Sequence, residues 1–284
     1  MKSTVRTKKM VECALLVAIG TVLSLFSVVN MPYGGSVTVA SMLPMVLISY
    51  RHGLSWGFGS GFVYAVVQQL LGLSNLMYFT TWQSIVAVIL LDYIIAFVAV
   101  GLGGVFRRAV KQQSLALVCG SVLVCLVRYL CHVVSGATVW AGLSIPTEAA
   151  LLYSFGYNAT YMIPETVVLV LAAYYIGSVL DFRREKPTRL AAVNSGCKAA
   201  DLLGAAAGLL TVGALATDVA LIFSHLQNAD GEFDITGLAV SSFAGSFWMG
   251  VVIVTAVAAA AVVSLIVVRQ MLLKSADKQN RAEA

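Results

Sequence analysis

Three ionisable side chains lie deep within long apolar stretches of this sequence: Asp92, Arg128 and His132. On insertion scales, a charged side chain at the centre of a membrane helix costs roughly 2.5 to 3.5 kcal/mol, so each one needs a partner or a function. Arg128 and His132 are four residues apart, which places both on one face of a helix. The three groups predict either a buried Asp92–Arg128 pair that fixes helix packing or a polar binding site.

Aromatic and amide side chains occur at a similar predicted depth. Trp140 lies in a loop, and Tyr153, Tyr157 and Asn158 occupy the beginning of the apolar stretch that follows. An indole can stack on a cationic ring, and an amide can pair with the edge of a heterocycle. Together with Asp92 these residues predict a pocket for a small, flat, nitrogen-bearing or cationic ligand. Tyr153 and Asn158 are about 140° apart on a helix, so a straight helix would not present both to one ligand.

The sequence contains no signature of chemistry beyond binding. The segment Gly196-Cys197-Lys198-Ala199 lacks both the spacing and the hydroxyl of a phosphate-binding loop, which predicts no ATP hydrolysis by that route. Neither metal-ligand spacing nor a Ser/His/Asp order is present, and we expect no cofactor. Glu165 follows Pro164 and is either a hydrogen-bond partner at a kink or a site residue. The five cysteines have no CxxC spacing and are interpreted as packing residues: Cys13, Cys119, Cys125, Cys131 and Cys197.

The composition indicates that lipid surrounds the elements that hold these side chains. The chain has 284 residues, of which 60% are hydrophobic and 11% charged, and its mean hydropathy is +0.90. A helix needs roughly 20 apolar residues to cross the hydrocarbon core, and no stretch alternates like a barrel strand. We therefore predict an all-α polytopic membrane protein with about eight spans: Met10 to Val29, Val37 to Tyr50, Leu54 to Gly72, Thr81 to Phe106, Ser114 to Ser135, Ala149 to Leu180, Lys198 to Ser224 and Leu238 to Leu273.

The distribution of Lys and Arg predicts the orientation, because cytoplasmic loops carry the excess of positive charge. Basic residues precede the first predicted span and follow every even-numbered one, whereas the opposite loops carry none; the last of these, His225 to Thr236, holds Asp230, Glu232 and Asp234. Both termini are therefore predicted to be cytoplasmic. The net charge of +5 is interpreted as a topology signal of a plasma-membrane protein and not as a nucleic-acid-binding surface.

The chain divides into three predicted parts: a six-helix binding domain (1–182), a basic cytoplasmic linker (183–197) and a C-terminal transmembrane hairpin with a basic tail (198–284). The hairpin is rich in Ala and Gly and is interpreted as packing. Gly53, Gly57 and Gly61 have four-residue spacing and predict a close helix contact. Ala14 and Ala18 form a similar small face, which could serve an internal neighbour or a separate protein.

An ordered set of short motifs resembles one membrane protein family, the thiamine-specific S components of energy-coupling factor importers. The likeness covers about residues 8 to 182. It is carried by Gly34-Gly35-Ser36-Val37-Thr38 leading to Ser41-Met42-Leu43-Pro44, by Arg51-His52-Gly53-Leu54, by Asp92-Tyr93, by His132 followed by Trp140, and by Tyr153-Ser154 followed by Asn158.

The resemblance implies a six-helix subunit that binds thiamine from outside and passes it inward when joined to a transmembrane coupling protein and two ATPases. It implies a site at His132, Trp140, Tyr153 and Asn158, with Asp92 where the family usually has Glu. Gly35 stands where some members have Trp. The resemblance also implies that Ala14 and Ala18 dock on the coupling protein. Together with the residues at the same predicted depth, the expected substrate-binding set is Asp92, Tyr93, Arg128, His132, Trp140, Tyr153, Tyr157 and Asn158.

Two other functions stay open on sequence alone. Within transport, the ligand could be another vitamin or only the pyrimidine moiety of thiamine. From another class, the chain could be a polytopic membrane enzyme or an assembly protein that uses Asp92, His132 and Glu165. A binding subunit needs partner proteins, whereas an enzyme should turn over alone.

Overall fold

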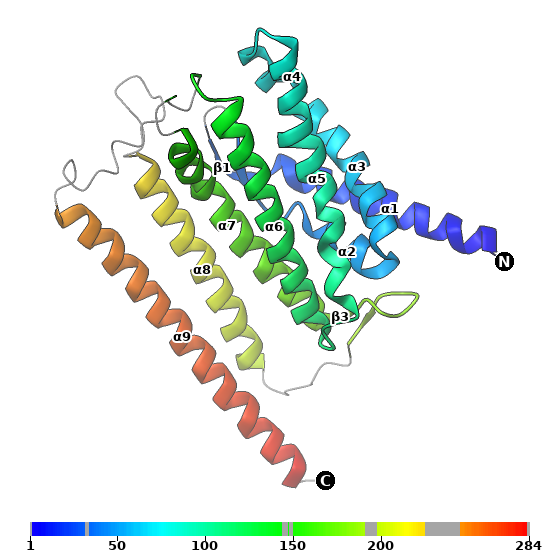
Figure 1. The fold of residues 1–284 in the computed structure, drawn as a ribbon. Coiled ribbons are helices and arrows are strands. Elements are labelled where there is room, and N and C mark those ends of the chain that lie inside the picture. Colours follow the sequence, from blue (N-terminus) through cyan, green and yellow to red (C-terminus); the bar gives the residue numbers. More distant parts are fainter. Residues whose placement is uncertain are drawn as a thin grey trace. The chain divides into compact units, whose positions relative to one another are not determined.

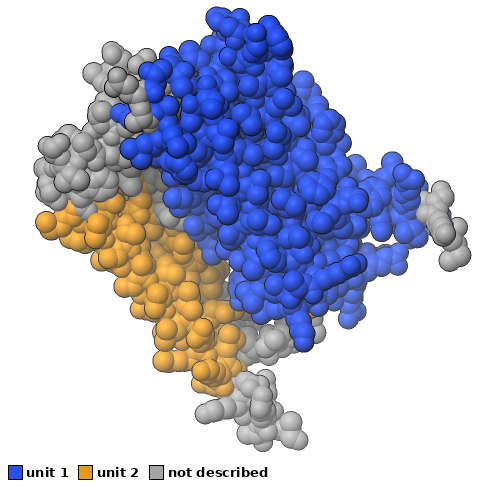
Figure 2. Space-filling model, in the orientation of Figure 1, with its two compact units in different colours: residues 1–188 blue, residues 189–284 orange. Residues whose placement is uncertain are grey.

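A computed structural model describes residues 2–31, 34–143, 147, 150–190, 198–224 and 245–282. It is largely helical (Figure 1) and divides into two compact units, Met1–Thr188 and Arg189–Ala284 (Figure 2). The boundary falls within the basic segment 183–197, of which residues 191–197 lie outside the described residues.

The first unit begins with a helix and a β-hairpin and continues with helices that pack on one another. In chain order its elements are α1 (Lys2–Leu25), β1 (Ser27–Asn30), β2 (Ser36–Thr38), α2 (Leu43–His52), α3 (Leu54–Leu71), η1 (Leu73–Tyr78), α4 (Trp82–Val88), η2 (Ile89–Ile95), α5 (Ala96–Val98), η3 (Ala99–Arg107), α6 (Gln113–Thr138), α7 (Ala150–Val179) and β3 (Leu180–Asp181). The two-residue strand β4 (Thr188–Arg189) falls on the boundary between the units. The second unit contains α8 (Lys198–Ser224) and α9 (Gly245–Ala282).

Four helical stretches among the described residues are long and apolar enough to cross a membrane: Trp82–Arg107, Gln113–Thr138, Ala150–Val179 and Met249–Ala276. The predicted helical, multi-pass character is thus confirmed. The count of eight spans and the cytoplasmic position of both termini stay predictions. The loop with Asp230, Glu232 and Asp234, on which part of that topology rests, lies outside the described residues.

The first two predicted spans differ from the structure. α1 ends at Leu25, and Ser27–Asn30 pairs antiparallel with Ser36–Thr38 as a β-hairpin, because the β-branched residues there favour strands and Gly34 and Gly35 adopt positive φ angles at the turn. α2 begins only at Leu43 and has 10 residues, about 15 Å, which is too short to cross a hydrocarbon core of about 30 Å. Nine of its residues are buried, so α2 is a core helix.

The fourth predicted helix is a continuous stretch that changes its hydrogen-bonding pattern from α4 through the π-helix η2 and the short α5 to the 3-10 helix η3. η3 packs closely on α2 and α3. The Ser49 hydroxyl donates to the Gly101 carbonyl at 2.5 Å and accepts from the Gly104 amide at 2.9 Å. A Cβ atom at Gly57 would lie 2.8 Å from the Gly101 carbonyl oxygen, and one at Gly61 would lie 3.1 Å from that of Phe97. The predicted close contact is therefore confirmed at these two glycines.

A buried arginine at the end of α2 ties three segments of the first unit together. Arg51 forms a bidentate ion pair with Glu12 of α1, with 2.5 Å between Nε and Oε1 and 3.2 Å between Nη2 and Oε2. Its guanidinium also donates to the Phe182 carbonyl at 3.1 Å and to the Glu185 carbonyl at 3.2 Å. Because the Arg51 side chain links α2 to α1 and to the chain after α7, it fixes α1 against the bundle.

The second unit is a helical hairpin in which α8 and α9 pack on each other. The Thr255 hydroxyl donates to Asp218 at 2.8 Å, and Arg269 donates to the Ala200 carbonyl at 3.1 Å.

The described part of the chain contains four free cysteines: Cys13, Cys119, Cys125 and Cys131. Cys197 lies outside the described residues.

Candidate ligand-binding site

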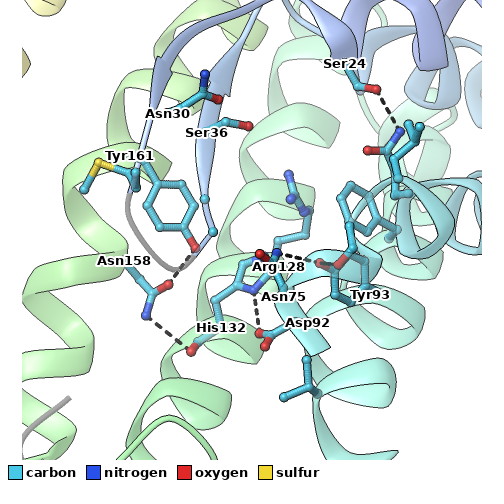
Figure 3. A pocket seen from close by; sticks show the side chains of 18 of the residues that line it. Ser24, Asn30, Ser36, Asn75, Asp92, Tyr93, Arg128, His132, Asn158 and Tyr161 are labelled. Carbon is cyan, nitrogen blue, oxygen red and sulfur yellow. Dashed lines mark hydrogen bonds and ion pairs between the residues drawn. The ribbon is translucent and has the colours of Figure 1, made fainter. Parts of the chain in front are cut away.

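The first unit contains a cavity of about 610 Å³, within the range of roughly 300 to 1,000 Å³ that small-molecule sites occupy (Figure 3). Its wall carries many polar side chains. Most lining residues belong to α1, the β1–β2 hairpin, α3, η1, the stretch from α4 to α5, α6 and α7, and Trp140 of the loop after α6 is also part of the lining. Residues far apart in the sequence therefore share one concave surface.

The π-helix η2 determines how Asp92 and Tyr93 reach this cavity. In a π-helix hydrogen bonds join residues five apart, so side chains with this spacing lie on one face. Val88 and Tyr93 have this spacing, as do Asp92 and Phe97, and all four line the cavity. In an unbroken α-helix, residues five apart would lie about 140° from each other, so the π geometry lets both members of each pair line the cavity.

Asp92 is the centre of the polar network. One carboxylate oxygen lies 2.9 Å from His132 Nδ1, and the other accepts from the Ser135 hydroxyl at 2.6 Å and the Trp140 indole N–H at 3.1 Å. The expected alternative, a buried Asp92–Arg128 pair, does not form among the described residues. Asp92 is instead a carboxylate held by three donors and exposed on the cavity wall.

His132 faces the cavity with one ring nitrogen still unused. Because the Asp92 carboxylate accepts from Nδ1–H, the neutral ring presents Nε2 as an acceptor. Nε2 is buried and has no hydrogen-bond partner among the described residues. An N–H group of a ligand would satisfy it.

Aromatic rings and an amide complete this end of the cavity. The Trp140 indole packs edge-on against Phe79, with ring centroids 4.7 Å apart. Asn158 donates to the His132 carbonyl at 3.3 Å and accepts from the Tyr161 hydroxyl at 2.6 Å. The Tyr157 hydroxyl donates to the Gly34 carbonyl at 2.8 Å, which ties α7 to the hairpin turn.

A second carboxylate, Glu165, lines the cavity from α7. Its oxygens accept from the Thr38 amide at 2.5 Å and from the Thr38 hydroxyl at 2.7 Å, and the Ser41 hydroxyl lies 2.8 Å from that of Thr38. Glu165 is only 3% exposed. Its contacts make it both an anchor for the β-hairpin and a charged part of the cavity wall.

Comparison with known proteins identifies the family. A family model described as thiamine transporter protein matches residues 10–183. The chain belongs to the thiamine transporter protein family. Thiamine transporter ThiT of Bacillus subtilis (strain 168) is 32% identical over 182 residues, which cover 60% of this chain and 91% of that protein. A solved structure of ThiT from Listeria monocytogenes has a TM-score of 0.49 and 21% identity, covering 61% of this chain and 94% of the other.

Family membership decides between the transporter and the membrane enzyme that the sequence left open. The thiamine transporter protein family is one of transporters, so this chain is a multi-pass membrane transport protein and not an enzyme. The match ends at residue 183, so the α8–α9 hairpin lies outside the part shared with the thiamine transporter family.

The structure brings most of the expected site residues of this thiamine transporter family member together. The cavity lining includes Asp92, Tyr93, Arg128, His132, Trp140, Tyr157 and Asn158. Tyr153 lies on α7 outside the lining, as its angular distance from Asn158 on a helix suggests.

Several lining residues were missed by sequence reasoning. Tyr161 follows Tyr157 at four-residue spacing on α7, and this helical period could have placed it on the same wall. Glu165, which the sequence left open as a hydrogen-bond partner or a site residue, lies four residues further and also lines the cavity. Asn75, whose side chain donates to the Tyr93 hydroxyl at 2.9 Å, lies in the 3-10 helix η1 and carried no such signal.

Proposed function

We propose that the cavity binds thiamine and that the chain is the substrate-binding membrane subunit of an energy-coupling factor importer. The observation that carries the proposal is the Asp92 carboxylate, held by three donors next to an indole and an unsatisfied imidazole nitrogen in one cavity. Thiamine has a permanently cationic thiazolium ring and a flat aminopyrimidine. Asp92 offsets the positive charge, Trp140 contacts a ring face, and His132 Nε2 accepts from the amino group.

The wider binding set includes Tyr93, Arg128, Tyr157 and Asn158 on the cavity wall, with Tyr153 outside it. Tyr157 and Asn158 donate to backbone carbonyls, and Asn158 Oδ1 accepts from Tyr161, so in this account they hold the wall in shape. Asn158 Oδ1 can accept one further hydrogen bond, from the pyrimidine edge.

Import requires partners, since the sequence contains no phosphate-binding loop. In our proposal these are a transmembrane coupling protein and two ATPases. Ala14 and Ala18 are exposed on α1, whereas Cys13 and Val17, which directly precede them, are buried against the first unit. The small exposed face permits another helix to approach closely within the bilayer. It is therefore the proposed docking face for the coupling protein.

The function is tested by thermal stabilisation of the purified, detergent-solubilised chain with thiamine, its pyrimidine fragment and other vitamins, since a ligand that binds only the folded state raises its melting temperature. We expect the largest shift with thiamine. An equal or larger shift with another vitamin would contradict the assignment.

Trp140→Ala is expected to weaken the binding of both thiamine and the pyrimidine fragment by about tenfold, because the contact of a desolvated ring with indole contributes up to about 2 kcal/mol. Trp140→Phe should retain part of the affinity through stacking, although it loses the N–H donated to Asp92. Titration of each variant by calorimetry measures the change. Unchanged affinity in a folded Trp140→Ala variant would remove the indole from the site.

A further inference from the structure

The buried guanidinium of Arg128 carries hydrogen-bond donors that the protein leaves unused. Arg128 is 8% exposed and lines the cavity. Nη1 donates to the thioether sulfur of Met42 at 2.7 Å, and the guanidinium carbon lies 4.3 Å from the centre of the Phe97 ring. A thioether is a weak acceptor, and Nε has no partner among the described residues. Leaving a buried charged donor unsatisfied is costly, so a ligand acceptor at this point would be bound strongly.

Glu165 provides the complementary group on the same cavity wall. Its carboxylate is fixed by the two hydrogen bonds from Thr38, and each oxygen has further acceptor capacity. Glu165 and Arg128 both line the cavity but form no ion pair in the described part of the chain. A ligand group that both accepts and donates a hydrogen bond fits such a separated donor and acceptor.

The position along α6 relates this pair to the rest of the site. Arg128 lies one helical turn, about 6 Å, from His132, which interacts with Asp92. A ligand whose cationic ring lies beside Asp92 can therefore extend a short substituent toward Arg128. Thiamine has such a substituent, a hydroxyethyl chain on its thiazolium ring.

We propose that Arg128 and Glu165 form an inner subsite for an uncharged hydroxyl group of the ligand. Arg128 donates a hydrogen bond to the hydroxyl oxygen, and Glu165 accepts a hydrogen bond from the hydroxyl O–H. The inference rests on the proposed function, in which the hydroxyl is that of the thiamine hydroxyethyl chain. A phosphate ester at the same place would satisfy Arg128 but would bring negative charge toward the buried Glu165 carboxylate, so the pair also selects the free alcohol over its phosphate ester.

The first test uses the unaltered protein and two ligands, thiamine and an analogue that lacks only the hydroxyl. Calorimetric titration should show the analogue binding at least about tenfold more weakly, since it loses the charge-assisted hydrogen bonds to both Arg128 and Glu165. Equal affinities would overturn the inference while leaving the proposed function intact. Failure of both ligands to bind would instead overturn the proposed function.

Arg128→Met tests whether the residue acts on the hydroxyl or only supports the fold. We expect thiamine to lose about tenfold in affinity and the analogue to lose little, because the analogue has no group for Arg128 to bind. His132→Gln, one turn away on α6, is the matched control and should weaken both ligands alike. If Arg128→Met also weakens both ligands alike, its role is structural and the subsite is refuted.

Glu165→Gln tests the selection against phosphate. The amide keeps the shape of the side chain and removes its charge, so the preference for thiamine over thiamine monophosphate should fall by about fivefold or more. An unchanged preference in a variant that still binds thiamine would overturn the role of Glu165.

Discussion

Asp92→Asn is expected to weaken thiamine binding by roughly ten- to hundredfold, because a charge-assisted contact contributes about 1.5 to 3 kcal/mol and about 1.4 kcal/mol is a factor of ten. The substitution removes the negative charge that faces the thiazolium ring. It also puts an amide NH₂ group where one carboxylate oxygen accepts from His132 or from Ser135 and Trp140. Calorimetric titration with thiamine measures the loss.

Two comparisons separate the charge from the local network. Ser135→Ala removes one donor to Asp92 but keeps the charge, so it should cost less than Asp92→Asn. The neutral pyrimidine fragment should lose less affinity than thiamine on Asp92→Asn. If the folded Asp92→Asn variant binds thiamine as tightly as the parent, Asp92 only holds His132, Ser135 and Trp140 in place.

Replacing both Ala14 and Ala18 with Leu is expected to reduce thiamine uptake in cells to the background level while leaving thiamine binding by the purified protein unchanged. Bulky side chains on this exposed face of α1 would keep the coupling protein from close contact. The cavity is unaffected because neither alanine lines it. Uptake of labelled thiamine in cells that contain the coupling protein and both ATPases, together with titration of the purified variant, measures the two effects separately.

Gly59→Leu is the matched control for this experiment. Gly59 is exposed on α3, and a Cβ atom there has no neighbour within 4 Å, so the variant adds a leucine side chain to another exposed helix face without a packing clash. Uptake should remain near the parental level. Normal uptake by the Ala14 and Ala18 double variant would remove this face from the docking proposal.

The sequence predicted the long helices well, since their signal is local. α3, α6, α7 and α8 lie within a few residues of the predicted apolar stretches. The β1–β2 hairpin and the short α2 were missed, because apolar β-branched residues resemble a membrane helix when only hydropathy is considered. α2 is apolar because it is buried within the first unit.

The site was predictable to the extent that polar side chains are rare within membrane helices. Asp92, Arg128 and His132 stood out for this reason, and all three line the cavity. Their pairing was not predictable, since it depends on the π-helix that turns Asp92 toward α6. The contact of Glu165 with Thr38 joins residues 127 positions apart and left no trace in the local pattern.

The central claim is that this cavity binds thiamine without any partner protein. The most direct test is calorimetric titration of the purified, detergent-solubilised chain with thiamine, in the absence of ATP and of coupling proteins. We predict saturable binding of one thiamine per chain that is weakened by Asp92→Asn. A chain with a cooperative melting transition that shows no saturable binding up to about 1 mM thiamine, a binding free energy weaker than about 4 kcal/mol, would contradict the account.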